Sequence, residues 1–143
     1  MDLSRVGIYG HSAGGYFTLR AMLIAPDVYH AGVSSFTVPD GYRQAPFVEY
    51  HLGLPQDNKE GYEYASNLQL AGNLKGKLLL IAGTSDTTAS FAPTMKMVEA
   101  LIRAGKPHDL IVLPEQGHGP SPGPSRTYWL EAIRRYFQEH LKP

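Results

Sequence analysis

A Gly-His-Ser-Ala-Gly segment at residues 10–14 places a serine between closely spaced glycines. It follows an apolar run at 6–9 and precedes an apolar stretch at 15–25 that suits a helix. At a sharp strand-to-helix turn, small residues on either side of the serine let the backbone close and expose its hydroxyl. The pattern predicts Ser12 as a nucleophile and the N–H of Ala13 as an oxyanion donor. The alternative is a phosphate-binding or plain turn loop with an incidental serine.

A serine hydroxyl is a poor nucleophile unless a base takes its proton and an acid orients that base. Asp86 follows the apolar run LLLIAG, and His118 follows LIVL with a glycine on each side. The order serine, aspartate, histidine, with each residue after a strand, is typical of α/β-hydrolases. We therefore predict Ser12, Asp86 and His118 as a catalytic triad, although Asp86 or His118 taken alone could be an ordinary loop residue.

The other histidines are weaker candidates. His11 is expected to point away from the serine side chain and to line the pocket or pack. His51 falls in a segment that could touch substrate, although packing suits it better, and surface roles suit His30, His108 and His140. No histidine pair has metal-ligand spacing, so the sequence predicts no catalytic metal and no cofactor.

Four short apolar runs are too continuous for amphipathic helices and read as buried strands. They alternate with three helical patterns: one at 15–25, one at 91–104 and one that begins near Ser125. Ser125 is the candidate N-cap of the last helix, and Gly105 is placed to end the helix at 91–104. Such alternation predicts an α/β fold with a mostly parallel sheet and helices on its faces. The predicted strands are 6–9, 32–36, 78–82 and 110–113.

Two segments interrupt the alternation. Residues 38–76 are rich in proline and glycine, with short helical hints at 47–52 and 62–68, and a connection of this length suits a pocket wall. Residues 117–125 carry three prolines and are expected to form an extended loop.

Composition limits the class of protein. The chain has 143 residues, 43% of them apolar, which suits one domain. Its 13 basic and 13 acidic side chains give no net charge, which argues against a nucleic-acid or membrane-surface binder. No apolar run suggests a membrane span, and the first residues lack a signal-peptide pattern, so a cytoplasmic location is favoured. Without cysteine there is no disulfide framework and no thiolate nucleophile.

Along nearly its whole length the sequence resembles the carboxyl-terminal half of the catalytic domain of prolyl oligopeptidase family serine peptidases. The resemblance is carried by RVGIYGHSAGG, PDVYHAGV, EYHLGLPQDNKEGY, LLLIAGTSD, VEALIRAGKPHDL and GHG. It is nearest to the dipeptidyl-peptidase and acylaminoacyl-peptidase branches. It implies a partial α/β-hydrolase fold and places nucleophile, acid and base at Ser12, Asp86 and His118.

The resemblance also implies substrate contacts. An aromatic residue two positions before the glutamate of E-x-x-x-G-L-P walls a small S1 pocket in the dipeptidyl-peptidase branch, and here that residue is Phe47. Tyr42 is a second candidate for the wall. Thr88 stands where the family has a polar substrate contact. The chain departs from the family at three places. The family usually has an aromatic residue beside the nucleophile, where this sequence has His11 and Ala13. The usual His-Gly before the acid loop is Ala82-Gly83 here, and the usual Asp-Asn-Val after the acid is Thr87, Thr88 and Ala89.

The expected function is hydrolysis of peptide bonds through an acyl-enzyme on Ser12, with a small or cyclic side chain in the pocket. A small-ester carboxylesterase using the same triad and a catalytically incompetent fragment are the alternatives. The resemblance implies a larger parent protein whose amino-terminal half supplies further strands and a second oxyanion donor, a tyrosine, and whose β-propeller gates the site. Without those strands, the strand at 6–9 would be an exposed edge, and self-association is expected.

Overall fold

The molecule is built on a four-stranded parallel sheet, described by a computed structural model for residues 2–40 and 46–142. The strands lie in the order β1-β2-β3-β4, and every neighbouring pair is parallel. The α/β class and the mostly parallel sheet predicted from the sequence are confirmed, and each predicted strand agrees with an observed one to within two residues. The strands are β1 (Gly7–His11), β2 (Ala31–Ser35), β3 (Lys77–Gly83) and β4 (Asp109–Leu113).

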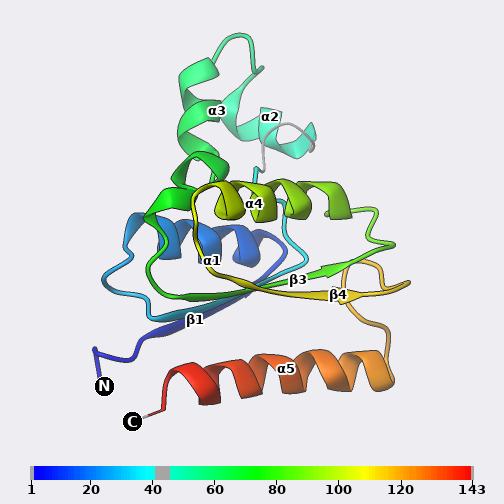
Figure 1. The fold of residues 1–143 in the computed structure, drawn as a ribbon. Helices are drawn as coiled ribbons and strands as arrows, with labels where there is room; N and C mark the ends of the chain where they lie inside the picture. Colours follow the sequence, from blue (N-terminus) through cyan, green and yellow to red (C-terminus); the bar gives the residue numbers. More distant parts are fainter. Residues whose placement is uncertain (1, 41–45, 143) are drawn as a thin grey trace.

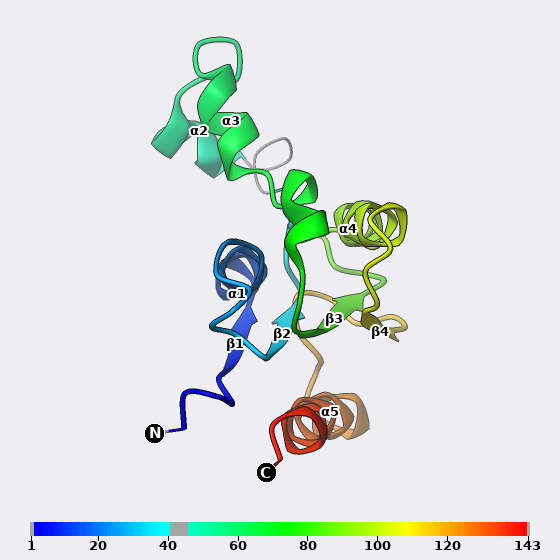
Figure 2. The same cartoon turned by 60° about the vertical axis from the view of Figure 1, so that its left-hand side comes forward.

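Helices cover both faces of this sheet (Figure 1). Helices α1 (Ala13–Ile24) and α4 (Phe91–Arg103) lie on one face, and α5 (Pro124–His140) lies on the other. Figure 2 shows the same three layers after a turn of 60°. Because all four strands are parallel, their carboxyl ends meet at one edge, where the loops after β1, β3 and β4 come together.

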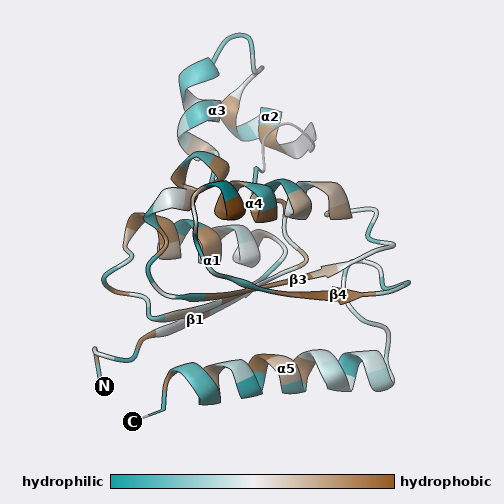
Figure 3. Cartoon of the chain, viewed as in Figure 1, coloured by the Kyte–Doolittle hydropathy of each residue, from teal (hydrophilic) through white to brown (hydrophobic). Residues whose placement is uncertain are grey.

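Alternation along β3 divides the apolar core in two. Leu78 and Leu80 pack with side chains of α1 and α4, whereas Leu79 and Ile81 pack toward α5. Figure 3 shows hydrophobic colour along β3 and β4, and both hydrophobic and hydrophilic turns on α5. The buried strands thus read as continuous apolar runs in the sequence because both of their faces are covered.

The long connection after β2 is more helical than its sequence suggests. It holds α2 (Pro46–Leu52), α3 (Lys59–Ala65) and a 3₁₀ helix η1 (Leu68–Asn73). The hint at 62–68 was placed three residues too late, because Asn58 caps α3: its side-chain oxygen accepts from the Gly61 N–H at 3.0 Å. Helices α2 and α3 lie beyond the layer of α1 and α4 (Figure 2).

Two helix ends test the capping expectations. The prediction that Ser125 caps the last helix is wrong: Gly123 is the N-cap and Pro124 the first helical residue. Proline suits that position because its fixed φ matches the helix and it has no N–H to satisfy. The loop before α5 accordingly ends earlier than the predicted 117–125. Gly105 adopts φ 65° just after α4, the left-handed conformation predicted for it.

Candidate active site

The turn between β1 and α1 holds Ser12 in a strained conformation. Its φ of 56° and ψ of −121° are unusual for a residue with a side chain. The Ser12 N–H donates to the Ser35 carbonyl of β2 at 2.9 Å, which anchors the turn to the sheet. The strain is the geometry expected of a nucleophile held at a strand-to-helix turn.

The two glycines of the turn differ in what they must accommodate. A Cβ on Gly10 would collide with the backbone of Gly14, so the turn closes only with glycine there. At Gly14 itself a Cβ would meet nothing within 4 Å among the described residues. The second tight position is Gly15, where a Cβ would stand 2.9 Å from the Thr37 side chain. The expectation that Gly14 must lack a side chain is therefore not explained by contacts in the described part of the chain.

The structure brings the three predicted catalytic side chains into one hydrogen-bonded line. His118 Nε2 lies 2.8 Å from Ser12 Oγ, and His118 Nδ1 lies 2.9 Å from Asp86 Oδ2. The three residues come from the loops after β1, β3 and β4, which are 32 to 106 positions apart in the chain. This is the arrangement in which an imidazole can take a proton from the serine hydroxyl.

Asp86 is fixed as well as buried. Its side chain is inaccessible to solvent, and Oδ1 accepts from the N–H groups of Thr88 and Ala89, each at 2.8 Å. One carboxylate oxygen is thus held by the backbone while the other faces His118. A carboxylate with both oxygens satisfied can remain charged at a buried position and orient the imidazole.

Ser12 is the N-cap of α1, so the helix N-terminus begins directly after the candidate nucleophile. Ala13 is the first residue of α1, where helix N–H groups have no carbonyl partner within the helix. The partial positive charge of the helix N-terminus adds to this donor. The predicted oxyanion role of the Ala13 N–H fits this position.

The ring of His11 packs against that of His118; packing was one of the two roles expected for it. Its centroid lies 5.1 Å from that of His118, 5.3 Å from Phe36 and 5.9 Å from Trp129. Sequence reasoning did not find Phe36 or Trp129, which complete this aromatic cluster. Phe36 directly follows β2, so an aromatic residue at a strand's carboxyl end was the available signal.

The remaining predicted contacts are less well placed. Thr88 is exposed beside Asp86, and its backbone N–H is used in holding that carboxylate. Tyr42 lies outside the described residues, and so does the side chain of Phe47, whose backbone belongs to α2. His30 accepts from the Val6 N–H at 3.2 Å, a structural role at the start of β1.

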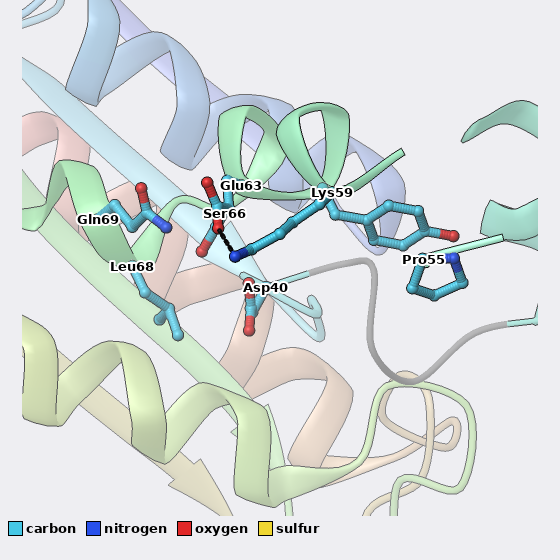
Figure 4. A pocket seen from close by; sticks show the side chains of 8 residues that line it. Asp40, Pro55, Lys59, Glu63, Ser66, Leu68 and Gln69 are labelled. Carbon is cyan, nitrogen blue, oxygen red and sulfur yellow. Dashed lines mark ion pairs between the residues drawn. The ribbon is translucent and has the colours of Figure 1, made fainter. Parts of the chain in front are cut away.

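A pocket of about 300 Å³ lies beside α3 (Figure 4). Lys59 and Glu63 form an ion pair of 3.7 Å there between exposed side chains. The pocket is lined by none of Ser12, Asp86 and His118; its lining residues are Asp40, Pro55, Lys59, Tyr62, Glu63, Ser66, Leu68 and Gln69.

Two further searches cover residues 2–40 and 46–142 only. No three histidine, aspartate or glutamate side chains there are grouped so that they could hold a metal ion. No helix in the same ranges combines the length and apolar character needed to cross a membrane.

A parallel sheet sandwiched between helices, with a strained serine at the first strand-to-helix turn, is the architecture of α/β-hydrolase domains. The chain belongs to the prolyl oligopeptidase family of serine peptidases, whose model matches residues 1–143. The family resemblance seen in the sequence is thereby confirmed.

Solved structures and curated relatives agree with this assignment. A putative dipeptidyl aminopeptidase IV of Bacteroides ovatus superposes with a TM-score of 0.93 at 34% identity, covering 98% of this chain and 20% of its own. Dipeptidyl peptidase 4 of Porphyromonas gingivalis gives 0.94 at 29% identity, covering 99% and 20%. Human dipeptidyl peptidase 8 is 32% identical over 99% of this chain and 16% of its own length.

The family also contains a relative without activity. A rat protein named inactive dipeptidyl peptidase 10 is 30% identical over 99% of this chain and 18% of its own length. The chain thus spans less than a fifth of the length of these curated relatives.

Proposed function

We propose that this chain carries the catalytic centre of a serine peptidase that cleaves peptide bonds through an acyl-enzyme on Ser12. The observation that supports this most directly is the continuous line from Ser12 Oγ through His118 to Asp86, at 2.8 and 2.9 Å. Order in the chain alone could not have ensured those distances, because the three residues stand on three separate loops.

In the proposed mechanism Ser12 Oγ attacks the substrate carbonyl while His118 Nε2 takes its proton. Asp86 accepts a hydrogen bond from His118 Nδ1–H and stabilises the imidazolium that forms. His118 then gives the proton to the leaving amine, and the acyl group remains on Ser12. A water then attacks the acyl carbonyl while His118 Nε2 takes its proton. The carboxylic acid product leaves as His118 returns that proton to Ser12 Oγ.

The oxyanion of each tetrahedral intermediate would be stabilised by the Ala13 N–H. One donor is typically worth a hundredfold to a thousandfold in rate, and a second is expected. We propose that the chain is one part of a longer peptidase catalytic domain whose amino-terminal half supplies that donor, a tyrosine, with a β-propeller gating the site. The relatives are about five to six times as long as this chain, which supports this proposal.

Substrate class depends on the pocket wall. The relatives named dipeptidyl peptidases, together with Phe47 before the E-x-x-x-G-L-P segment, favour a peptide with a small or cyclic residue, such as proline or alanine, before the cleaved bond. Tyr42 is proposed for the same wall, and the exposed Thr88 hydroxyl for a polar contact to substrate.

Labelling with a fluorophosphonate tests the nucleophile. We expect covalent modification of Ser12 in the parent protein and none in Ser12→Ala. The absence of label in folded wild-type protein would favour the alternative of a catalytically incompetent fragment. A relative named as inactive shows that the family includes proteins without activity.

Parallel assays separate the two hydrolase alternatives. Faster turnover of aminoacyl-proline amides than of short acyl esters supports a peptidase, and the reverse order supports an esterase. Phe47→Ala should weaken discrimination for proline by about 1–3 kcal/mol, the usual effect of a small change in an apolar pocket. Unchanged selectivity would remove Phe47 from the site.

A further inference from the structure

The backbone around His118 is hydrogen-bonded on both sides: the Gly119 N–H donates to the Gly117 carbonyl at 2.8 Å and the Ser85 N–H to the Gln116 carbonyl at 3.0 Å. Glycines precede and follow His118, and Gly119 has a φ of 128° that other residues rarely adopt. A general base must be held within a fraction of an ångström and a few degrees of its working geometry. Backbone bonds do not fix the torsion angles of the side chain, so the orientation of the ring depends on its bonds to Ser12 and Asp86 and on the side chains packed against it.

His11 provides the nearest such ring contact. Its ring is tilted 55° to that of His118 at a centroid distance of 5.1 Å, nearer than Phe36 at 6.5 Å. His11 is the last residue of β1 and directly precedes Ser12, so its position is fixed by the sheet and by the strained turn. Phe36 and Trp129 support its other sides.

The surroundings of His11 disfavour a charge on it. Burial lowers its pKa and the neighbouring charge of His118 lowers it further, against smaller opposing effects of Asp86 and of a hydrogen bond to the His118 backbone. His11 Nδ1 is buried without a hydrogen-bond partner in the described part of the chain, so a proton there would lack an acceptor. Phe36, directly after β2, and Trp129 of α5 carry no charge, which leaves His118 and Asp86 as the titratable groups facing His11.

We propose that His11 is a positioning residue whose uncharged ring holds the imidazole of His118 in line between Ser12 and Asp86. The inference rests on the proposed function, since it assigns His11 a role in that reaction. When His118 takes the Ser12 proton, an uncharged neighbour adds no repulsion to the imidazolium, whereas a cation at this distance would oppose it.

Two substitutions separate ring packing from the ring nitrogens. His11→Ala removes the packing, and we expect the rate of fluorophosphonate labelling and kcat to fall about tenfold to a hundredfold, with KM changed less than about threefold. His11→Phe restores an uncharged ring and should stay within about threefold of wild type. His108→Ala is the matched control, because His108 directly precedes β4 and its ring nitrogen Nδ1 contacts the nearby Lys106 carbonyl at 3.0 Å. Labelling of His11→Ala at the wild-type rate, or of His11→Phe as slowly as His11→Ala, would overturn the proposal.

A second readout does not depend on turnover. The proton shared between His118 Nδ1 and Asp86 should give a protected, downfield NMR resonance in wild type, in His11→Phe and in Ser12→Ala. It should be broadened or lost in His11→Ala. If the resonance is protected in wild type and lost in His11→Ala, but wild-type protein is not labelled by the fluorophosphonate, the proposed function fails while the positioning role stands. An equally protected proton in wild type and His11→Ala overturns the positioning role, whatever the labelling shows.

Discussion

At the scale of single residues, Ser12, His118 and Asp86 form one hydrogen-bonded unit, so their substitutions should not act independently. Ser12→Ala and His118→Ala should each reduce kcat of the parent protein by about a millionfold, and the double variant should be little worse. Asp86→Asn should cost about ten-thousandfold, because the imidazole loses the partner that fixes its tautomer. Steady-state kinetics of the four variants check this, and losses that multiply in the double variant would contradict it.

His11 should also make the folded state sensitive to acid. Its pKa is lowered from an ordinary value of 6.5, chiefly by burial, so the unfolded chain binds this proton more tightly than the folded one. The resulting stability is present above about 6.5 and is lost as the pH falls below that value. Urea unfolding at pH 7.5 and 5.5 should show a smaller loss in His11→Phe than in wild type. His108→Phe serves as control, and an equal loss in all three proteins would exclude the effect.

At the scale of elements, α5 is tied to the sheet by a hydrogen bond as well as by apolar packing. Tyr136 is 8% exposed, and its hydroxyl donates to Asp109 Oδ2 of β4 at 3.1 Å. Tyr136→Phe should lower the free energy of unfolding by about 1.5–3 kcal/mol, the usual loss for a bond to a charged group. Tyr128→Phe, which changes a half-exposed ring on the same helix, should have almost no effect.

The same tyrosine gives α5 a dependence on alkaline pH. Burial, followed by the charge of Asp109, raises the Tyr136 pKa above its ordinary value of 10.0. The folded state therefore keeps a proton that the unfolded chain releases, and stability falls as the pH rises beyond about 10. Chemical unfolding at pH 9 and 10.5 should show a steeper fall in wild type than in Tyr136→Phe, and parallel curves would count against this account.

The elements also show what the sequence could and could not predict. Strand β3 was readable because both of its faces are covered, which leaves the short continuous apolar run at 78–82. Asp86 and His118 could be assigned because parallel strands deliver their following loops to one edge of the sheet. The start of α5 was misplaced because Ser125 matched a capping preference that Pro124 overrode. The contacts of His11 with Phe36 and Trp129 join three distant elements, and no local pattern in the sequence encodes them.

At the scale of the whole molecule, β1 is the end strand of the described sheet, and no described strand pairs with its outer side. Tyr9 on β1 is 43% exposed, and Phe17 and Ile24, seven residues apart on α1, are 64% and 59% exposed. An edge strand with little charge and no proline next to an apolar helix stripe invites pairing with another chain. In the longer relatives' architecture, we propose that the amino-terminal half of the domain covers this side.

On the proposal that the second oxyanion donor and the cover for β1 come from the amino-terminal half, the 143-residue chain expressed by itself should self-associate and have at most a trace of hydrolase activity. Light scattering should show concentration-dependent assembly, and co-expression with the amino-terminal half should restore both a monodisperse particle and turnover. Phe17→Lys on α1 should reduce the assembly, whereas Tyr128→Lys on α5, on the opposite face of the sheet, should leave it unchanged. A monodisperse monomer that melts cooperatively and turns over peptide substrates at the rate of a full-length relative would show that this side of the sheet needs no partner.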